Sequence, residues 1–270
     1  MVHNQKATMC NVNLNEFHLK DIENEIHPSI FIKNEEYDVL IMRLPYQSEK
    51  TFKNESHAFV VTESSYYFYD KVEKEFKDLH DIQGLYNILN EKINIAMHMT
   101  YNLYNKIERI EDGFYEHRYI KRFNHQWFFY KNSLIKINRV ISKAMEAMKM
   151  FIKNYKIQDD FLEINFQDLL EHLERTSRTA AHALEKLDAL YNFYVSNSNE
   201  KMNRTIYVLT LFSGIFLPLN LIVGFFGMNT TSLPFSTLEG GTYVVMMILF
   251  FMMFLSLSII MYVRKMKTKD

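Results

Sequence analysis

Two stretches near the end of the chain decide its fold: TIYVLTLFSGIFLPLNLIVGFF at 205–226 and TYVVMMILFFMMFLSLSIIMYV at 242–263. Each contains 22 residues and no charged side chain. At the rise of an α-helix, a segment of this length extends about 33 Å, which matches the hydrocarbon thickness of a bilayer. Soluble helices of that length almost always keep a polar face. The sequence therefore predicts two membrane spans.

The average composition hides this segregation. The 270 residues include 31 basic and 32 acidic side chains, yet Glu239 is the only charged residue in 205–263. A net charge of −1 provides no basic field for phosphates, so we expect no nucleic-acid partner. The sequence also lacks a glycine-rich phosphate-binding motif and a nucleophile–base constellation, so we do not expect an enzyme.

The basic residues that flank the two stretches predict the orientation in the membrane. Lys201 and Arg204 precede the first stretch, and the loop between the stretches has no basic residue. The tail after the second stretch is basic, with Arg264, Lys265, Lys267 and Lys269. By the positive-inside rule, both termini lie in the cytoplasm. We expect a multi-pass protein of the cell inner (plasma) membrane with the loop 227–241 outside.

A series of residues that includes most of the polar side chains of the first stretch begins just before it and continues at alternating spacings of three and four, which places the series on one face of a helix. The stripe consists of Asn203, Ile206, Thr210, Ser213, Leu217, Asn220 and Gly224. An asparagine in hydrocarbon is costly unless it faces protein or water. The stripe fits two interpretations, which are hydrogen bonding between packed helices and the lining of a pore.

We expect the rest of the chain to lie in the cytoplasm. No proline or glycine occurs between Phe114 and Ser213, and apolar residues recur at near-heptad spacing from Leu162 to Val195. These patterns predict one helix from about Asp159 to Phe226. Two further helices are expected at 82–112 and 114–155, with short loops near Gly113 and 156–158. Apolar runs predict strands at 37–44, 57–63 and 65–70, the first bounded by Pro45.

The predicted fold class is an α+β membrane protein, in which a small α/β domain precedes a helical hairpin and a long stalk helix that continues into the first span. The expected segments are an α/β domain at 1–80, a helical hairpin at 81–158, a stalk helix and first span at 159–226, an outer loop at 227–241, a second span at 242–263, and a basic tail at 264–270.

Gly227, Met228 and Asn229 directly follow the first span, with Asn229 eleven residues after the proline of Leu-Pro, and a short loop leads to the second span. This arrangement resembles the CorA family of divalent-cation channels. The resemblance implies a homopentamer in which the first span lines one pore and the second span surrounds it. It favours pore lining for the stripe, with pore-facing positions at Asn203, Ile206, Leu209, Ser213, Leu217 and Asn220. The asparagines of the motif would form an oxygen ring at the outer mouth, suited to hydrated Mg²⁺.

The resemblance also implies a regulatory cation site between subunits, where Asp21 of the LKDIEN segment would meet Asp168 of the FQDLLEH segment. Bound Mg²⁺ there would hold the pore shut. Lys20 stands where family members can carry a second acid, which would weaken this feedback.

The loop after the motif leaves the transported ion open. It reads TTSLPFSTLEGG, is similar to that of the ZntB branch, and contains Glu239 as its only acid. Co²⁺, Ni²⁺ and Zn²⁺ are therefore alternatives to Mg²⁺, and a non-conducting two-span scaffold organised by its coiled coil is an alternative to a channel.

Overall fold

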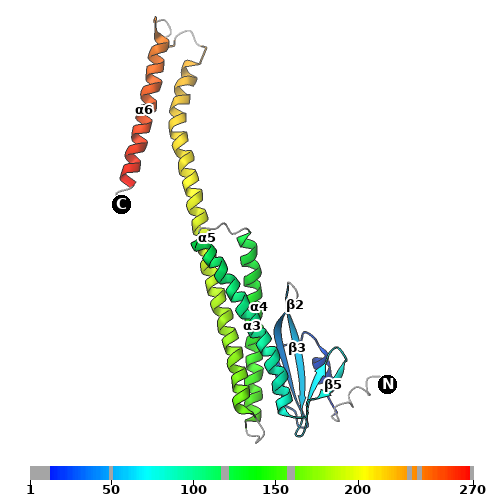
Figure 1. Cartoon of the computed structure of the whole chain (residues 1–270). Helices are drawn as coiled ribbons and strands as arrows, with labels where there is room; N and C mark the ends of the chain where they lie inside the picture. Colours follow the sequence, from blue (N-terminus) through cyan, green and yellow to red (C-terminus); the bar gives the residue numbers. More distant parts are fainter. Residues whose placement is uncertain are drawn as a thin grey trace. The chain divides into compact units, whose positions relative to one another are not determined.

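The computed structural model describes residues 13–48, 51–116, 122–156, 162–229, 233–235 and 239–267. It divides into two compact units, Met1–Asn192 and Phe193–Asp270, which are described separately. The strands and most helices belong to the first unit, and the second unit contains the two apolar helical segments (Figure 1).

The first unit begins with a short helix and a sheet. Helix α2 starts after Asn15, whose side chain accepts a hydrogen bond from the backbone N–H of Phe17. The five strands follow one another in space as they do in sequence, and every neighbouring pair is antiparallel. The elements are α2 (Glu16–Glu23), β1 (Ile30–Ile32), β2 (Asp38–Ser48), β3 (Thr51–Val61), β4 (Tyr66–Asp70) and β5 (Glu75–Asp78).

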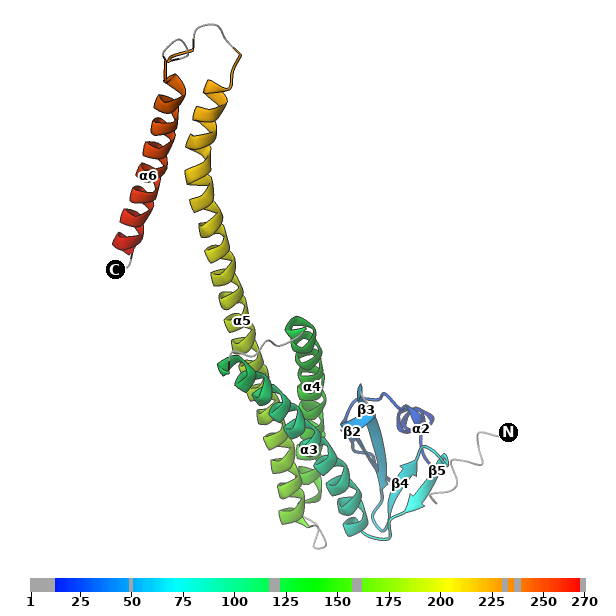
Figure 2. The same cartoon turned by 45° about the horizontal axis from the view of Figure 1, so that its top comes forward.

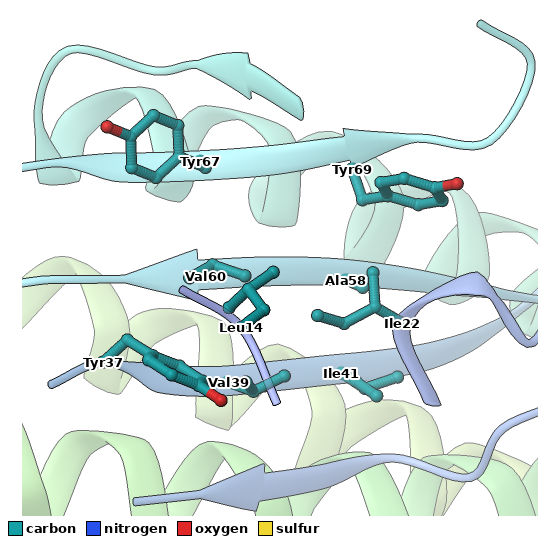
Figure 3. Packing of buried hydrophobic residues seen from close by; sticks show 9 residues of the cluster. All are labelled: Leu14, Ile22, Tyr37, Val39, Ile41, Ala58, Val60, Tyr67 and Tyr69. Atoms are coloured by element: carbon teal, nitrogen blue, oxygen red, sulfur yellow. The ribbon is translucent and has the colours of Figure 1, made fainter. Parts of the chain in front are cut away.

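The two faces of the sheet are both buried, by different elements. Since side chains alternate along a strand, Val39 and Ile41 face one side and Leu40 and Met42 the other. Ile22 of α2 packs on the first face, in a cluster shown in Figure 3 with Leu14, Tyr37, Val39, Ile41, Ala58, Val60, Tyr67 and Tyr69. Helices α3 (Ile82–Tyr115) and α4 (Phe123–Tyr155) pack against the strands on the opposite face (Figure 2).

The long stalk helix is confirmed. Helix α5 runs as one element over Glu163–Phe226, and the boundary between the two units falls inside it. The predicted start at Asp159 lies outside the described residues. The second unit also contains α6 (Gly241–Lys267), which covers the second predicted span. Both α5 and α6 include a window apolar and long enough to cross a membrane.

Within the first unit, α5 packs against both α3 and α4. The ring of Phe166 lies 5.8 Å from Tyr86 of α3, and the ring of Trp127 of α4 stacks on Tyr191 of α5 at 4.3 Å. The Lys186 ammonium lies 2.6 Å from a carboxylate oxygen of Glu111 on α3. Aromatic and ionic contacts therefore hold α5 along the length of the hairpin formed by α3 and α4.

Several predicted boundaries are wrong. Strand β2 continues through Pro45 because the neighbour β1 pairs only with residues 39–41, so a residue without an N–H can sit at this open edge. Helix α3 continues through Gly113, and α4 begins at Phe123 rather than Phe114. The stalk buries Ala183 and Leu190. Leu184 and Tyr191, which belong to the near-heptad series between Leu162 and Val195, are only partly buried, because the helix packs against two neighbours instead of one.

Candidate ion pathway

The stripe predicted from the spacing lies on the last third of α5, in the second unit. All six of the predicted pore-facing residues are exposed in the single chain: Asn203, Ile206, Leu209, Ser213, Leu217 and Asn220. No residue of the most apolar window of this helix is buried. Polar residues in membrane helices normally face a partner helix or water rather than lipid. The described residues of one chain do not cover this face.

The GMN motif forms the turn that ends this helix. The backbone N–H of Gly227 donates a 2.8 Å hydrogen bond to the carbonyl of Val223, which closes the last turn. A Cβ atom at position 227 would lie 3.0 Å from that same oxygen, so glycine allows the close approach. Asn229, two residues after Gly227, is exposed, as is Glu239 in the loop before α6. Asn229 therefore lies at the end of α5 that carries the predicted stripe.

Pro218 lies inside the helix, within the stripe region. It has no N–H, so the carbonyl of Gly214, four residues earlier, has no helical donor. Membrane helices tolerate such a position where neighbouring groups or water satisfy the carbonyl. An added Cβ at Gly214 would meet no atom of the described residues within 4 Å, so those residues leave this part of the helix surface open.

The two predicted regulatory acids do not meet within one chain. Asp21 lies on α2, on one side of the sheet, whereas Asp168 lies on α5, which packs on the helices covering the other side. In the described part of the chain, no group of three or more histidine, cysteine or acidic residues could hold a metal ion. One chain alone therefore does not build the predicted cation site.

Each of these acids has a histidine neighbour that the sequence analysis missed. The Asp21 carboxylate lies 3.4 Å from Nε2 of His27, and the Asp168 carboxylate lies 3.6 Å from Nε2 of His172. The spacing of four between Asp168 and His172 on a helix is a signal that the sequence contained. His27 follows the end of α2, where the sequence pattern gave no indication of a contact with Asp21.

A second cluster of titratable groups lies at a cavity of about 250 Å³ where β3, β4 and α3 meet. His57 lies in its wall and stacks on Phe68 at 6.4 Å. Burial, reinforced by the charges of Lys92 and Lys71, lowers the pKa of His57 to about 4. His57 is therefore neutral at physiological pH, and the lining mixes two lysines with Glu55, Asp70 and Glu91.

The two apolar helices and the turn that ends the first of them lie within a region that matches a known protein family. The profile of the family described as "CorA-like Mg2+ transporter protein" matches residues 9–265. The chain belongs to the CorA family. The match includes the sheet, the helical hairpin, α5 and nearly all of α6, so CorA membership covers both units. CorA proteins are divalent-cation transporters of membranes, which agrees with the two apolar helices.

Individual CorA relatives are distant. YfjQ of Bacillus subtilis (strain 168) is 22% identical over 150 residues, which is 55% of this chain and 47% of YfjQ. The cobalt/magnesium transport protein CorA of Methanocaldococcus jannaschii is 25% identical over 163 residues, 60% of this chain and 51% of the relative. The aligned segments thus span about half the length of these two curated relatives.

Solved structures show the CorA fold at still lower identity. The complete structure of the CorA magnesium transporter from Methanocaldococcus jannaschii matches with a TM-score of 0.75 at 17% identity, covering 95% of this chain and 85% of that one. The ZntB cytoplasmic domain from Vibrio parahaemolyticus matches with a TM-score of 0.52 at 12% identity, covering 71% of this chain and 82% of that domain. These likenesses confirm the predicted fold class.

Proposed function

We propose that this chain is one subunit of a homopentameric channel that carries divalent cations, with Mg²⁺ as the principal ion, into the cytoplasm. The observation that carries the proposal is the exposed stripe of α5, which ends at Asn229 of the GMN turn. The stripe combines asparagine and serine side chains with apolar residues on one helix face in a segment long enough to span a membrane.

Assembly is a physical requirement of this proposal. Two helices cannot enclose a polar path, because one side of the path would remain open to lipid. Several copies arranged in a ring, each contributing its α5 stripe, enclose the path and shield the polar side chains from hydrocarbon. The membership in the CorA family and the resemblance described above support five copies.

The asparagine ring is the proposed entry site. Mg²⁺ gives up its water ligands reluctantly, so a ring of neutral amide oxygens that bind the hydration shell suits its capture and release. Five Asn229 side chains offer such oxygens without the deep binding well that carboxylates would create. Further inside, Asn220 and Asn203 provide polar side chains that contact the hydrated ion along the pore.

Apolar side chains between these asparagines would form the gate. Rings of Ile206, Leu209 and Leu217 produce constrictions that a hydrated ion passes only when they widen and admit water. An inside-negative membrane potential drives entry, since a divalent cation gains about 4.6 kcal/mol per 100 mV. The basic residues that flank both spans favour a cytoplasmic location for the two termini and an outer location for the GMN turn.

Regulation would come from the cytoplasmic unit. Since Asp21 and Asp168 do not meet within one chain, a cation can bridge them only between α2 of one subunit and α5 of the next. A bound divalent cation neutralises the two carboxylates and holds neighbouring subunits together, which favours the closed state. Asp168 and Glu171 are more than half exposed and are thus accessible to a neighbouring copy.

The test is cation flux into liposomes containing the full-length protein. Asn229→Ala should abolish the flux, whereas Ser256→Ala on α6 should preserve it, since the Ser256 hydroxyl bonds within its own helix to the carbonyl of Met252. Unchanged flux in Asn229→Ala would overturn the pore assignment. Absence of flux in the wild-type protein, with a pentamer still formed, would instead support a scaffold.

The same assay identifies the ion. Mg²⁺, Co²⁺, Ni²⁺ and Zn²⁺ are compared with and without a proton gradient. A channel for Mg²⁺ passes this ion without a gradient. A preference for Zn²⁺ that depends on the gradient would favour a ZntB-like transporter, an alternative suggested by the single acid of the outer loop, Glu239.

A further inference from the structure

The cavity of about 250 Å³ between β3, β4 and α3 lies in the first unit, apart from the proposed ion pathway. It is far larger than the roughly 30 Å³ that one water molecule occupies in the liquid, so it has room for a ligand of several non-hydrogen atoms. Its lining contains three acids and two lysines together with His57. The class of ligand depends on which of these charges are already paired.

The three acids of the lining do not need a cationic ligand. Asp70 accepts hydrogen bonds from two backbone N–H groups of the following turn, at 2.9 and 3.2 Å, and from the Lys77 ammonium at 2.6 Å. The bond from Lys77, and then the two backbone bonds, lower the pKa of Asp70. Glu91 pairs with its neighbour Lys92 at 2.9 Å. The side chain of Glu55 is half exposed, so water solvates its carboxylate.

Lys71 is the charge that the lining leaves without a close counter-ion. It directly follows β4 and is partly buried. Its ammonium donates a long hydrogen bond, 3.4 Å, to the carbonyl of Asn24, and no carboxylate of the described residues lies within ion-pair distance of it. Burial lowers the pKa of Lys71, although Glu25 and Glu55 act in the opposite direction. A partly desolvated ammonium without a close partner is destabilising, and an anionic ligand would offset this cost.

The buried ring of His57 adds a hydrogen-bond donor to the same cavity. Its side chain is 7% exposed, and the Glu55 carboxylate lies 3.8 Å from Nε2, beyond hydrogen-bonding distance. No hydrogen bond joins this ring to another of the described residues, so an N–H of the neutral ring is available to a ligand. The charges of Lys92 and Lys71 act on the ring more strongly than that of Glu91. The potential at this wall of the cavity is therefore positive.

We propose that the cavity binds a small oxyanion, a phosphate or carboxylate compound, between Lys71 after β4, Lys92 on α3 and His57 on β3. Lys92 keeps two N–H donors besides the one that it gives to Glu91. Charge-assisted hydrogen bonds from the two ammonium groups, and one bond from the imidazole, would hold the anion. None of these three residues belongs to the predicted pore stripe or to the predicted regulatory acids, so the site stands apart from the proposed function.

The first measurement is the melting temperature of the full-length protein in detergent, in phosphate-free buffer at neutral pH and constant ionic strength. Inorganic phosphate, glycerol 3-phosphate and succinate are added separately, which distinguishes phosphates from carboxylates. At least one of them should raise the melting temperature of the wild type in a saturable manner, because a ligand of the folded state stabilises it. If none of the three does so, the proposal is overturned.

Lys71→Met should lower the affinity for the stabilising probe by at least about ten-fold, the effect of losing one hydrogen bond to a charged group. Without the probe this variant should be at least as stable as the wild type, because it removes a partly buried charge that lacks a close partner. Lys71→Arg keeps the charge and should retain binding. Lys74→Met, which changes an exposed lysine of the same turn, is the matched control and should bind like the wild type.

The ring resonances of His57 in protein with isotope-labelled histidine give a second readout at the site itself. They are identified by their loss in His57→Gln. The stabilising probe should shift them in the wild type but not in Lys71→Met, and the resonances of His98, an exposed histidine of α3, should not move. Equal stabilisation of the wild type and Lys71→Met, with unmoved His57 resonances, would place the anion elsewhere and overturn the proposal. Loss or retention of cation flux in Asn229→Ala leaves both readouts unchanged.

Discussion

The hydroxyl of Tyr155 donates a 2.8 Å hydrogen bond to the carboxylate of Asp38, which joins the last residue of α4 to the first residue of β2. The same carboxylate accepts hydrogen bonds from the side chain of Asn154 at 3.2 Å and the backbone N–H of Asn34 at 3.1 Å. Burial, and then the bond to Asp38, raise the pKa of Tyr155, so the hydroxyl remains a donor. This network holds the helical hairpin on the sheet.

Tyr155→Phe should destabilise the first unit by about 1–3 kcal/mol, because it leaves the buried Asp38 carboxylate without one of its donors. The measurement is thermal unfolding of the full-length protein in detergent. Tyr101→Phe, which removes the hydroxyl of an exposed tyrosine on α3, is the control and should have little effect. Equal melting temperatures for Tyr155→Phe and the wild type would show that the carboxylate finds other donors.

Stability should fall as the pH drops below neutrality because of His57. Its pKa is about 4 in the folded state and 6.5 without burial, so the unfolded chain binds the proton more readily between these values. The contribution of neutral His57 is complete above pH 6.5 and is lost as the pH falls toward 4. The loss amounts to roughly 3 kcal/mol over this window.

The variant His57→Gln isolates this effect, since glutamine does not titrate. Its melting temperature should decline less between pH 7 and pH 5 than that of the wild type, by a difference that corresponds to about 2 kcal/mol. His98→Gln removes an exposed histidine of α3 and should decline like the wild type. Parallel declines in His57→Gln and the wild type would rule out a buried neutral imidazole at position 57.

The ion pair between Lys186 and Glu111 should couple α5 to α3. The hydrogen bond to Glu111 raises the pKa of Lys186, and the ammonium also lies 5.3 Å from the centre of the Tyr104 ring. A double-mutant cycle with Lys186→Met and Glu111→Gln should give a coupling energy of about 1 kcal/mol, since both side chains are about three-quarters buried. A coupling of zero would mean that solvent fully screens the pair.

Glu239→Gln should weaken cation capture at the outer mouth. Glu239 is the only acid of the loop 227–241. In the proposed pentamer its loss would remove five negative charges from the outer mouth and should raise the half-saturating cation concentration for flux by about two- to five-fold at low ionic strength. The maximal flux should not change, since the pore itself is intact. A reduced maximal flux with an unaltered half-saturating concentration would place Glu239 in the pore instead.

The long helices were predictable because their signals are strong and repeated. The uncharged stretches and the absence of breakers before Ser213 predicted α5 and α6 well, with α5 beginning at Glu163 in the structure. Glycine and proline were weaker signals than expected. Gly113 destabilises a helix by only about 1 kcal/mol, and the packing of α3 offsets this cost. Pro45 is tolerated because it lies where β2 has no neighbour on one side.

The short elements were not predicted, because little in their sequence favours them. Helix α2 has eight residues and is fixed by the buried side chain of Ile22, with Leu19 packed beside it against the same core cluster. Strands β1 and β5 have only three and four residues, and each is held by pairing with a longer neighbour. Tertiary contacts rather than local pattern therefore determine this part of the sheet.

The candidate site was also only partly predictable from the sequence. Helical spacing predicted that Asn203, Ser213 and Asn220 share one face of α5, and this requires only the helix itself. Their role in a pore remains a prediction. The contact between Asp21 and His27 depends on how the chain turns after α2, which no local pattern specifies.

The stacking of Trp127 on Tyr191 has a practical consequence. The chain contains a single tryptophan, and this residue contacts the last turn of α5 before the boundary between the two units, with the Lys131 ammonium 4.9 Å from its ring centre. The tryptophan fluorescence of the unlabelled protein therefore reports only on the contact between α4 and α5 at Trp127. Any movement that separates α4 from α5 at this turn would change the wavelength and intensity of that emission, so the molecule contains its own optical probe.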